Sequence, residues 1–259
     1  MPTRASAPAG APCWVDLWTS DVEDSRRFYC RIFGWEAHEP SPEFGGYFMF
    51  TRGGVPIAGG MGDMPGMRAQ NVWKVYLSTE SAAATVAAAQ SAGATIAAPA
   101  MAVADLGTQA VLVDPTGAVL GVWQPGTFPG FTVLGEPGAP SWFELRTRDH
   151  GAAVAFYRSV FHWETEPLPA DSGLTYTTAR NPGGDVPCAG IMDASRHLPE
   201  GVSAKWCVCW DVRDVDATLE TVKALGGSVV TPALDTPFGR FATVTDPAGA
   251  EFQLRTANR

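Results

Sequence analysis

An internal repeat constrains the fold of this 259-residue chain more than any other feature. Residues 14–36 and 142–164 align without a gap, so that "WVDLWTSD" from Trp14 is answered by "WFELRTRD" from Trp142. Three more pairs follow in the same order along the two halves, namely "VPIAGGM" and "VPCAGIM", "SAGATI" and "LGGSVV", and "DPTGAVLGV" and "DPAGAEFQL". Matches that keep their order along both halves indicate two copies of one domain.

A Pro- and Gly-rich stretch, "QPGTFPGFTVLGEPGAP" at 124–140, separates the copies. Such a composition is typical of a connection between domains. We therefore expect a first domain at 12–125, a linker at 126–139 and a second domain at 140–257. Residues 1–11 contain no apolar run, so we expect a short flexible arm there and no secretory signal.

Within each half, the predicted strands and helices follow one order twice. Alternation over residues 14–19 predicts a strand, Asp21 can cap a helix, and Gly34 can end it. Apolar and small residues at i, i+3, i+4 and i+7 from Ser25 to Ile32 give that helix one buried stripe. Short strands are then expected at 35–39, 46–52 and 55–61. The order restarts with a strand at 72–78, a helix at 81–92 and strands at 94–98, 108–113 and 118–124, so each half reads βαβββ-βαβββ.

Composition excludes several classes of protein. The net charge is −9 and no basic run appears, which argues against binding to nucleic acid. No apolar stretch approaches the ~20 residues that span a bilayer, so no membrane association is expected. Five cysteines without CxxC spacing argue against a disulfide framework or a zinc site and favour a cytoplasmic location. Walker, G-x-S-x-G and G-x-G-x-x-G patterns are also missing.

The repeated segments resemble a known family. "DLWTSDVEDSRRFYCRIFGWE", "DPTGAVLGV", "ELRTRDHGAAVAFYRSVFHWE" and "TDPAGAEFQL" are similar to the vicinal oxygen chelate superfamily, which includes glyoxalase I, bleomycin-resistance proteins and extradiol dioxygenases. The resemblance covers about residues 12–125 and 140–256. It implies an α+β fold in which four βαβββ modules form two tandem glyoxalase-like domains. Each domain would have a cup-shaped mixed sheet with helices outside and a ligand or metal site in the cup.

The metal ligands that this resemblance implies are not present. The ligand on the first strand falls on Trp14 and Trp142, and the ligand on the last strand falls on Gly121 and Gln253. The middle ligand falls near Trp73 and Cys207. Trp and Gly side chains do not bind metals, and an amide oxygen alone is a weak ligand. The four histidines, His38, His150, His162 and His197, have no ligand spacing either, so we expect no metal and no cofactor.

Strand alternation predicts which side chains face each cup. If Trp14 and Trp142 face inward, so do the residues two and four positions further on. The first cup then receives Trp14, Asp16 and Trp18, with Val119, Gly121 and Trp123 from the last strand. The second receives Trp142, Glu144 and Arg146, with Glu251, Gln253 and Arg255. The first cup is expected to be more aromatic and the second more polar.

One loop is a further candidate, "DTPFGR" at 235–240. It resembles a loop that rims the cup in family members. Phe238 could cover a ligand there, and Arg240 could contact its carbonyl or carboxylate. Alternatively the segment is only a tight turn shaped by Pro and Gly.

Asp16 and Glu144 have two interpretations. They accept hydrogen bonds that join the modules, or they anchor or deprotonate a flat ligand held between tryptophans. The first function hypothesis is accordingly metal-free binding of a hydrophobic, aromatic natural product or drug-like metabolite, as in bleomycin-type antibiotic resistance. The alternative is an enzyme of secondary metabolism with Asp16 or Glu144 as acid or base. Its activity would be hydroxylase-like, isomerase, cyclase or glyoxalase-type lyase. A small molecule is the only expected partner, and the chain is a monomer or a homodimer.

Overall fold

The computed structural model describes residues 4–169 and 173–257; residues 1–3, 170–172 and 258–259 lie outside the described chain. Two open eight-stranded mixed sheets and four α-helices make up the fold, which confirms the predicted α+β class with two tandem domains.

The first half contains two α-helices, one 3-10 turn and eight strands. They are β1 (Pro12–Trp18), α1 (Val22–Phe33), β2 (Glu36–Ala37), η1 (Pro42–Phe44), β3 (Phe48–Arg52), β4 (Val55–Met61), β5 (Val72–Ser78), α2 (Ala82–Ser91), β6 (Thr95–Val103), β7 (Gly107–Val113) and β8 (Val119–Pro125). The strands lie in the order β2-β3-β4-β1-β5-β8-β7-β6. β1 and β5 are antiparallel neighbours at the centre, and each also pairs in parallel with the last strand of its own module.

The second half repeats this arrangement. Its elements are β9 (Pro140–Thr147), α3 (His150–Phe161), β10 (Glu164–Pro167), β11 (Tyr176–Arg180), β12 (Ala189–Asp193), β13 (Ala204–Asp211), α4 (Val215–Ala224), β14 (Ser228–Thr236), β15 (Gly239–Thr245) and β16 (Glu251–Thr256). The strand order is β10-β11-β12-β9-β13-β16-β15-β14, the counterpart of the first sheet.

Local sequence chemistry starts the helices where the sequence predicts. The side chain of Asp21 accepts a hydrogen bond from the backbone N–H of Asp24, and Asp149 does the same for Ala152. The first helix ends at Gly34, which has a left-handed backbone with φ of 69°. At the equivalent position the second half has His162, also left-handed with φ of 55°.

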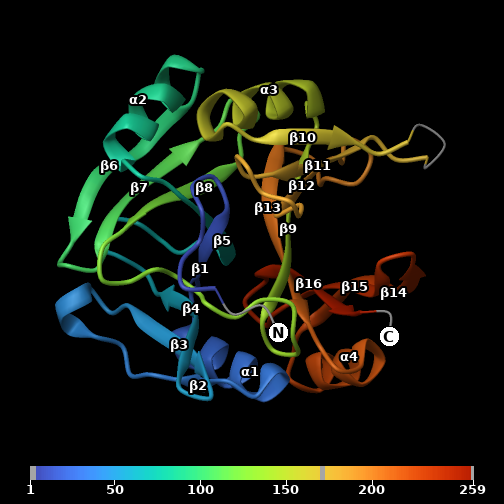
Figure 1. Cartoon of the computed structure of the whole chain (residues 1–259). Helices are drawn as coiled ribbons and strands as arrows, with labels where there is room; N and C mark the ends of the chain where they lie inside the picture. Colours follow the sequence, from blue (N-terminus) through green and yellow to red (C-terminus); the bar gives the residue numbers. More distant parts are fainter. Residues whose placement is uncertain (1–3, 170–172, 258–259) are drawn as a thin grey trace.

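The two sheets pack back to back around one shared core. β5 and β13, the central strands, contact each other, and the rings of Trp73 and Trp210 lie 5.4 Å apart. α1 lies beside α4 and α2 lies beside α3, so the helices cover the facing sides of both sheets (Figure 1). The helix-free faces therefore point away from each other. We call them the first and the second inner face.

Two symmetry-related hydrogen-bond chains cross the domain boundary. Trp73 Nε1 donates to Tyr29 Oη at 3.0 Å, and Tyr29 Oη donates to Asp246 Oδ2 at 3.0 Å. In the other direction, Trp206 donates to Tyr157 and Tyr157 donates to Asp114, at 3.0 and 2.9 Å. Both tyrosines are fully buried. The aspartates of the repeated "DPTG" and "DPAG" segments thus join the domains.

The N-terminal segment is held in place from Arg4 onward, whereas a flexible arm was expected at 1–11. Gly10 O accepts a hydrogen bond from Trp163 Nε1 at 2.7 Å, and Ala7 and Ala11 are buried. The linker repeats this contact, because Gly138 O accepts from Trp35 Nε1 at 2.7 Å. Each segment therefore packs on the helix end of the other domain. None of the described helices is long and apolar enough to cross a membrane.

Candidate functional site

The first inner face is built from the three central strands. Cross-strand register places Tyr76 of β5 beside both Trp14 of β1 and Gly121 of β8, and it places Lys74 beside Asp16. The alternate residues on β1 and β5, such as Val15 and Leu77, are fully buried on the helix side. Trp14 and Asp16 therefore share the inner face, on the side that alternation predicts.

Hydrogen bonds hold the aromatic side chains of this face. Trp14 Nε1 lies 3.0 Å from Asp16 Oδ1 and 2.9 Å from Tyr47 Oη, and Tyr47 Oη donates to Asp16 Oδ1 at 2.8 Å. Tyr47 fits only because position 59 is Gly, where an added Cβ would lie 1.7 Å from Tyr47 Oη. One oxygen of Asp16 therefore serves the structural role that was one of its two interpretations.

Lys74 is a residue that the sequence reasoning missed. Its ammonium lies 5.1 Å from the ring centroid of Tyr76, a cation–π contact. Tyr76 in turn covers Gly121, where an added Cβ would lie 2.0 Å from the ring. Burial lowers the pKa of Lys74, and the charge of Asp16 opposes this shift only in part. The available signal was position, since antiparallel pairing sets Lys74 opposite Asp16.

The linker covers one end of the first inner face. Phe128 packs edge-on against Trp14 with centroids 4.8 Å apart, and its carbonyl accepts from Trp123 Nε1 at 3.0 Å. At the other end of β1, Trp18 Nε1 donates to Gly62 O at 3.0 Å. This face is therefore mainly aromatic, with Asp16 and Lys74 as its charged groups.

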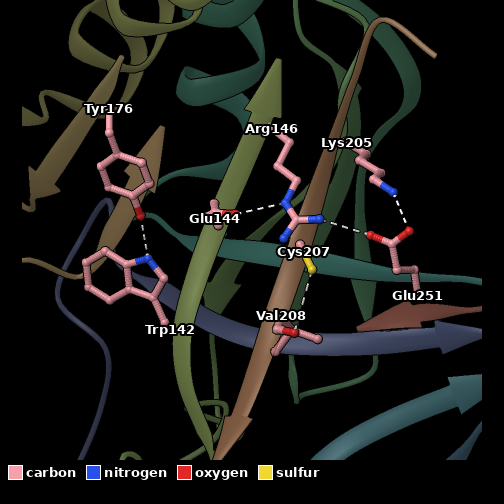
Figure 2. Close-up of polar contacts among 8 residues, drawn as sticks. All are labelled: Trp142, Glu144, Arg146, Tyr176, Lys205, Cys207, Val208 and Glu251. Carbon is pink, nitrogen blue, oxygen red and sulfur yellow. Dashed lines mark hydrogen bonds and ion pairs between the residues drawn. The ribbon is translucent and has the colours of Figure 1, made fainter. Parts of the chain in front are cut away.

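The second inner face repeats the Trp–Tyr pair. Trp142 Nε1 donates to Tyr176 Oη at 2.8 Å, as Figure 2 shows. Gly190 leaves room for Tyr176, because a Cβ there would lie 1.9 Å from its hydroxyl. The carboxylate two residues after the tryptophan behaves differently, since Glu144 bonds to a cation.

A chain of ion pairs crosses three strands of this second face (Figure 2). Arg146 Nε donates to Glu144 Oε1 at 2.8 Å, and its Nη1 donates to Glu251 Oε1 at 3.1 Å. Lys205 Nζ completes the chain on Glu251 Oε2 at 2.7 Å. Cys207 lies beside Arg146, and burial raises the pKa of its thiol to about 11, so the sulfur is protonated at neutral pH.

The remaining predicted site residues divide into two groups. Gln253 lies on the second inner face beside Cys209, and Arg255 binds Asp211 through two hydrogen bonds of 2.7 and 3.0 Å. Phe238 lies 65% exposed at the tip of the β14–β15 hairpin. Arg240 binds Asp216 at the start of α4 on the helix side of the sheet. The structure therefore does not bring Phe238 and Arg240 to the ion-pair chain.

The middle metal-ligand position was predicted near Trp73, but in the structure Trp73 does not lie on the inner face. Trp73 pairs with Leu17, so both face the helices, and the indole bonds to Tyr29. The neighbours of the two inner tryptophans on the fifth strand of each sheet are Tyr76 and Cys209. Antiparallel register across β1 and β5 decides this, and the spacing of motifs along the chain does not reveal it.

The donor groups across the two faces do not fit a metal ion. Cross-strand pairing places three residues side by side at the level of each inner tryptophan. They are Trp14, Tyr76 and Gly121 in the first domain, and Trp142, Cys209 and Gln253 in the second. Burial raises the pKa of Cys209 far above its ordinary range, which disfavours the thiolate that a metal needs. Within residues 4–169 and 173–257, no group of three or more His, Cys, Asp or Glu could hold an ion.

Two surface hollows lie away from the centre of both faces. One of about 470 Å³ lies between the start of α3 and the β10–β11 hairpin, with His150, Leu168 and Tyr176 among its lining residues. Another of about 330 Å³ lies where Ala7–Ala9 meet the ends of β5 and β8.

Comparison with known proteins gives the family. Residues 139–254 match the model of the "Glyoxalase/Bleomycin resistance protein/Dioxygenase superfamily", and residues 13–122 match that of the "Glyoxalase-like domain". The chain belongs to this superfamily. Two tandem glyoxalase-like domains are what the resemblance in the sequence implies, and that prediction is confirmed.

Two proteins are similar to this one over nearly the whole chain. "Anthracycline biosynthesis protein DnrV" from Streptomyces peucetius is 38% identical over 95% of this chain and 92% of its own. "Putative glyoxylase CFP32" from Mycobacterium bovis is 34% identical over 98% of this chain and 97% of its own. The structure of a Mn(II)-bound glyoxalase from Novosphingobium aromaticivorans is similar with a TM-score of 0.63 and 16% identity, covering 95% of this chain and 82% of that one. At this identity the likeness concerns the fold alone.

Proposed function

We propose that this protein binds a hydrophobic aromatic small molecule of secondary metabolism on an inner face, without the metal that other superfamily members use. The observation that carries the proposal is the donor set across the central strands. At the positions where the resemblance implies metal ligands, the chain has indole, phenol, thiol and amide side chains and a glycine. Aromatic walls with a few polar groups suit a flat organic ligand better than an ion.

The relatives support the metabolic setting. Similarity to anthracycline biosynthesis proteins along nearly the whole chain supports a role in secondary metabolism. Anthracyclines are planar polycyclic compounds, and tryptophan and tyrosine side chains present faces on which such rings can stack.

A glyoxalase-like enzyme is the second candidate. The similarity to CFP32 favours it, as does Asp16, a buried carboxylate without an ion-pair partner within 4.0 Å among the described residues. Asp16 would then act as the acid or base. Glu144 is less suited to this role, because its Oε1 is already bound by Arg146 Nε at 2.8 Å.

One experiment separates the two candidates. Tryptophan fluorescence is titrated with planar aromatic metabolites, and the recovered ligand is analysed by mass spectrometry. Stoichiometric quenching with unchanged ligand is the result expected of a binding protein. Turnover that disappears in Asp16→Asn, while Glu144→Gln retains it, would favour the enzyme instead.

A further inference from the structure

The centre of the first inner face is covered by the protein's own aromatic side chains. Trp14, Asp16 and Tyr76 are only 5%, 6% and 3% exposed there. The rings of Phe128 and Phe131 pack on the indole of Trp14, with centroids 4.8 and 6.2 Å away. A flat ligand could stack on Trp14 only if these rings moved, so the centre of this face is closed to such a molecule.

Trp18 is the more accessible tryptophan of the first face. It is half-buried, and no aromatic ring of the described chain packs against it. Its indole nitrogen already donates to Gly62 O, and its neighbours on the adjacent strands are Met61 and Val72. Trp18 and these neighbours therefore offer apolar surface but no free side-chain donor that could orient a ligand.

The second inner face differs from the first at its tryptophan. Trp142 takes the place of Trp14, but it is half-buried, and none of the rings that the structure describes stacks on its indole. The hydroxyl of Tyr176 holds only the indole nitrogen, and the neighbour of Trp142 on β13 is Cys209. The indole of Trp142 is therefore accessible and without a stacking partner in the described chain.

A hydrogen-bond donor lies on the same face near Trp142. Arg146 uses its Nε for Glu144 and its Nη1 for Glu251. Its Nη2 donates to no residue of 4–169 or 173–257 and is not a buried atom, and the side chain is 16% exposed. In Figure 2 the guanidinium extends from Arg146 toward the level of Glu144, in the direction of Trp142. Glu144 lies two residues from Trp142, roughly 7 Å along a strand, so three fused rings can cover the indole and reach the guanidinium.

The charges around Arg146 compensate one another. Glu144 and Glu251 pair with Arg146 and Lys205 in one chain of contacts at 2.8, 3.1 and 2.7 Å. An ionised ligand would add a charge without a partner at a partly buried place, which is costly. A neutral carbonyl oxygen can accept the free N–H of Nη2 and leave this balance unchanged. The second face therefore favours an uncharged molecule that carries a carbonyl group.

We infer that the second inner face binds an uncharged planar aromatic ketone or quinone, stacked on Trp142 and hydrogen-bonded through its carbonyl oxygen to Arg146 Nη2. The inference rests on the proposed function and adds the face, the two contact residues and the ligand class. Trp142 supplies the aromatic contact. Arg146 supplies the orientation, because a hydrogen bond from a charged donor is stronger than one between neutral groups.

Two matched tryptophan substitutions test the choice of face. Binding of 2-hydroxyanthraquinone is measured by equilibrium dialysis, in a buffer below the pKa of its phenol so that the probe is neutral. Trp142→Leu should weaken binding roughly 2- to 12-fold, the range for the loss of an aromatic pair, and Trp142→Phe should retain it. Trp18→Leu, at the half-buried tryptophan of the first face, should bind like the wild type.

A comparison of probes tests the contact of Arg146. 2-Hydroxyanthracene has the same ring outline without carbonyl groups, and anthraquinone-2-carboxylate adds a negative charge to the quinone. The wild type should bind the carboxylate more weakly than 2-hydroxyanthraquinone. Arg146→Lys keeps a cation beside Glu144 and Glu251 but has no second guanidinium edge. Its preference for 2-hydroxyanthraquinone over 2-hydroxyanthracene should be at least about 10-fold smaller than that of the wild type.

The outcomes distinguish this inference from the proposed function. Wild-type affinity in Trp142→Leu, or an equal loss in Trp18→Leu, would remove the second face as the site. Tighter binding of the carboxylate, or an unchanged preference in a folded Arg146→Lys, would remove the neutral carbonyl contact. Each of these results overturns the inference but leaves aromatic binding intact. If the wild type binds none of the three probes, the proposed function itself fails.

Discussion

At the scale of single residues, the same indole–phenol pair occurs twice and the carboxylate beside it is used differently each time. Trp14 shares its tyrosine with Asp16, whereas Trp142 bonds Tyr176 while Glu144 pairs with Arg146. Tyr47 lies 33 residues from Trp14, and Glu251 lies 105 residues from Arg146, so neither partner could be read from a local pattern. Strand alternation was enough to predict which face Trp14, Asp16, Trp142 and Glu144 occupy.

Arg146 is expected to contribute measurably to stability. Arg146→Met leaves Glu144, which is 8% exposed, without its cation. We expect a loss of about 2–4 kcal/mol in the free energy of unfolding, because a buried charge without a partner is costly. Denaturation in urea measures it. Arg158→Met, at an exposed arginine of α3, is the matched control and should stay within ~0.5 kcal/mol of the wild type. Equal losses of stability in the two variants would mean that the ion pairs of Arg146 do not stabilise the fold.

The contribution of Asp246 to the free energy of unfolding is expected to depend on pH. Burial raises its pKa above the ordinary value of 3.8. A raised folded-state pKa means that the carboxyl stabilises the fold most below pH 3.8 and that this contribution is lost as pH rises through the folded pKa. The stability advantage of the wild type over Asp246→Asn should therefore shrink as pH rises from the acidic range to neutrality.

Urea denaturation at several pH values measures this difference. Asp185→Asn, in an exposed loop, corrects for the loss of one acidic residue. An advantage that grows with pH would show that the ionised carboxylate is the stabilising form.

At the scale of elements, the sequence predicted the strands better than the segments between them. The strands predicted at 55–61 and 72–78 have those bounds, because each is a short segment of mainly apolar residues. The strand predicted at 94–98 extends to Val103, since β6 keeps pairing with β7 across two irregularities. The sequence predicted a flexible arm at 1–11 and a linker at 126–139, and it did not predict that Gly10 and Gly138 each bond to a tryptophan of the other domain. The groups that accept these two hydrogen bonds are backbone carbonyls, which leave no mark in the sequence.

Substitution of Gly10 tests whether the N-terminal segment packs against the second domain. Its φ is +80°, and an added Cβ would lie 2.8 Å from Phe161 O. Gly45 has a similar φ of +65° but open space around it. Gly45→Ala should cost about 1 kcal/mol from backbone strain alone. Gly10→Ala should cost clearly more, because the segment must also move from Trp163. Equal losses of stability in thermal or urea denaturation would mean that the segment is not held against the second domain.

At the scale of the whole molecule, the two domains share one core. Trp73 of the first sheet packs on Trp210 of the second, and the Tyr29 and Tyr157 bonds cross between the halves in opposite directions. The duplicated sequence predicted two domains, but the shared core depends on contacts such as Tyr29 with Asp246, which are 217 residues apart.

The shared core predicts one cooperative unfolding transition. Tryptophan fluorescence and far-ultraviolet circular dichroism should report the same midpoint in urea, since neither sheet keeps its helix side covered alone. Tyr29→Phe should lower that midpoint for both probes together. Two separate transitions would mean that the domains are independent.

The central claim is that the inner faces bind an aromatic ligand at the positions where the resemblance to the superfamily implies a metal. The most direct measurement is the affinity for 2-hydroxyanthraquinone, followed by tryptophan fluorescence, before and after exhaustive dialysis against EDTA and again with Mn²⁺ added. We predict the same dissociation constant in all three conditions. Binding that is lost on dialysis and restored by Mn²⁺ would contradict the claim.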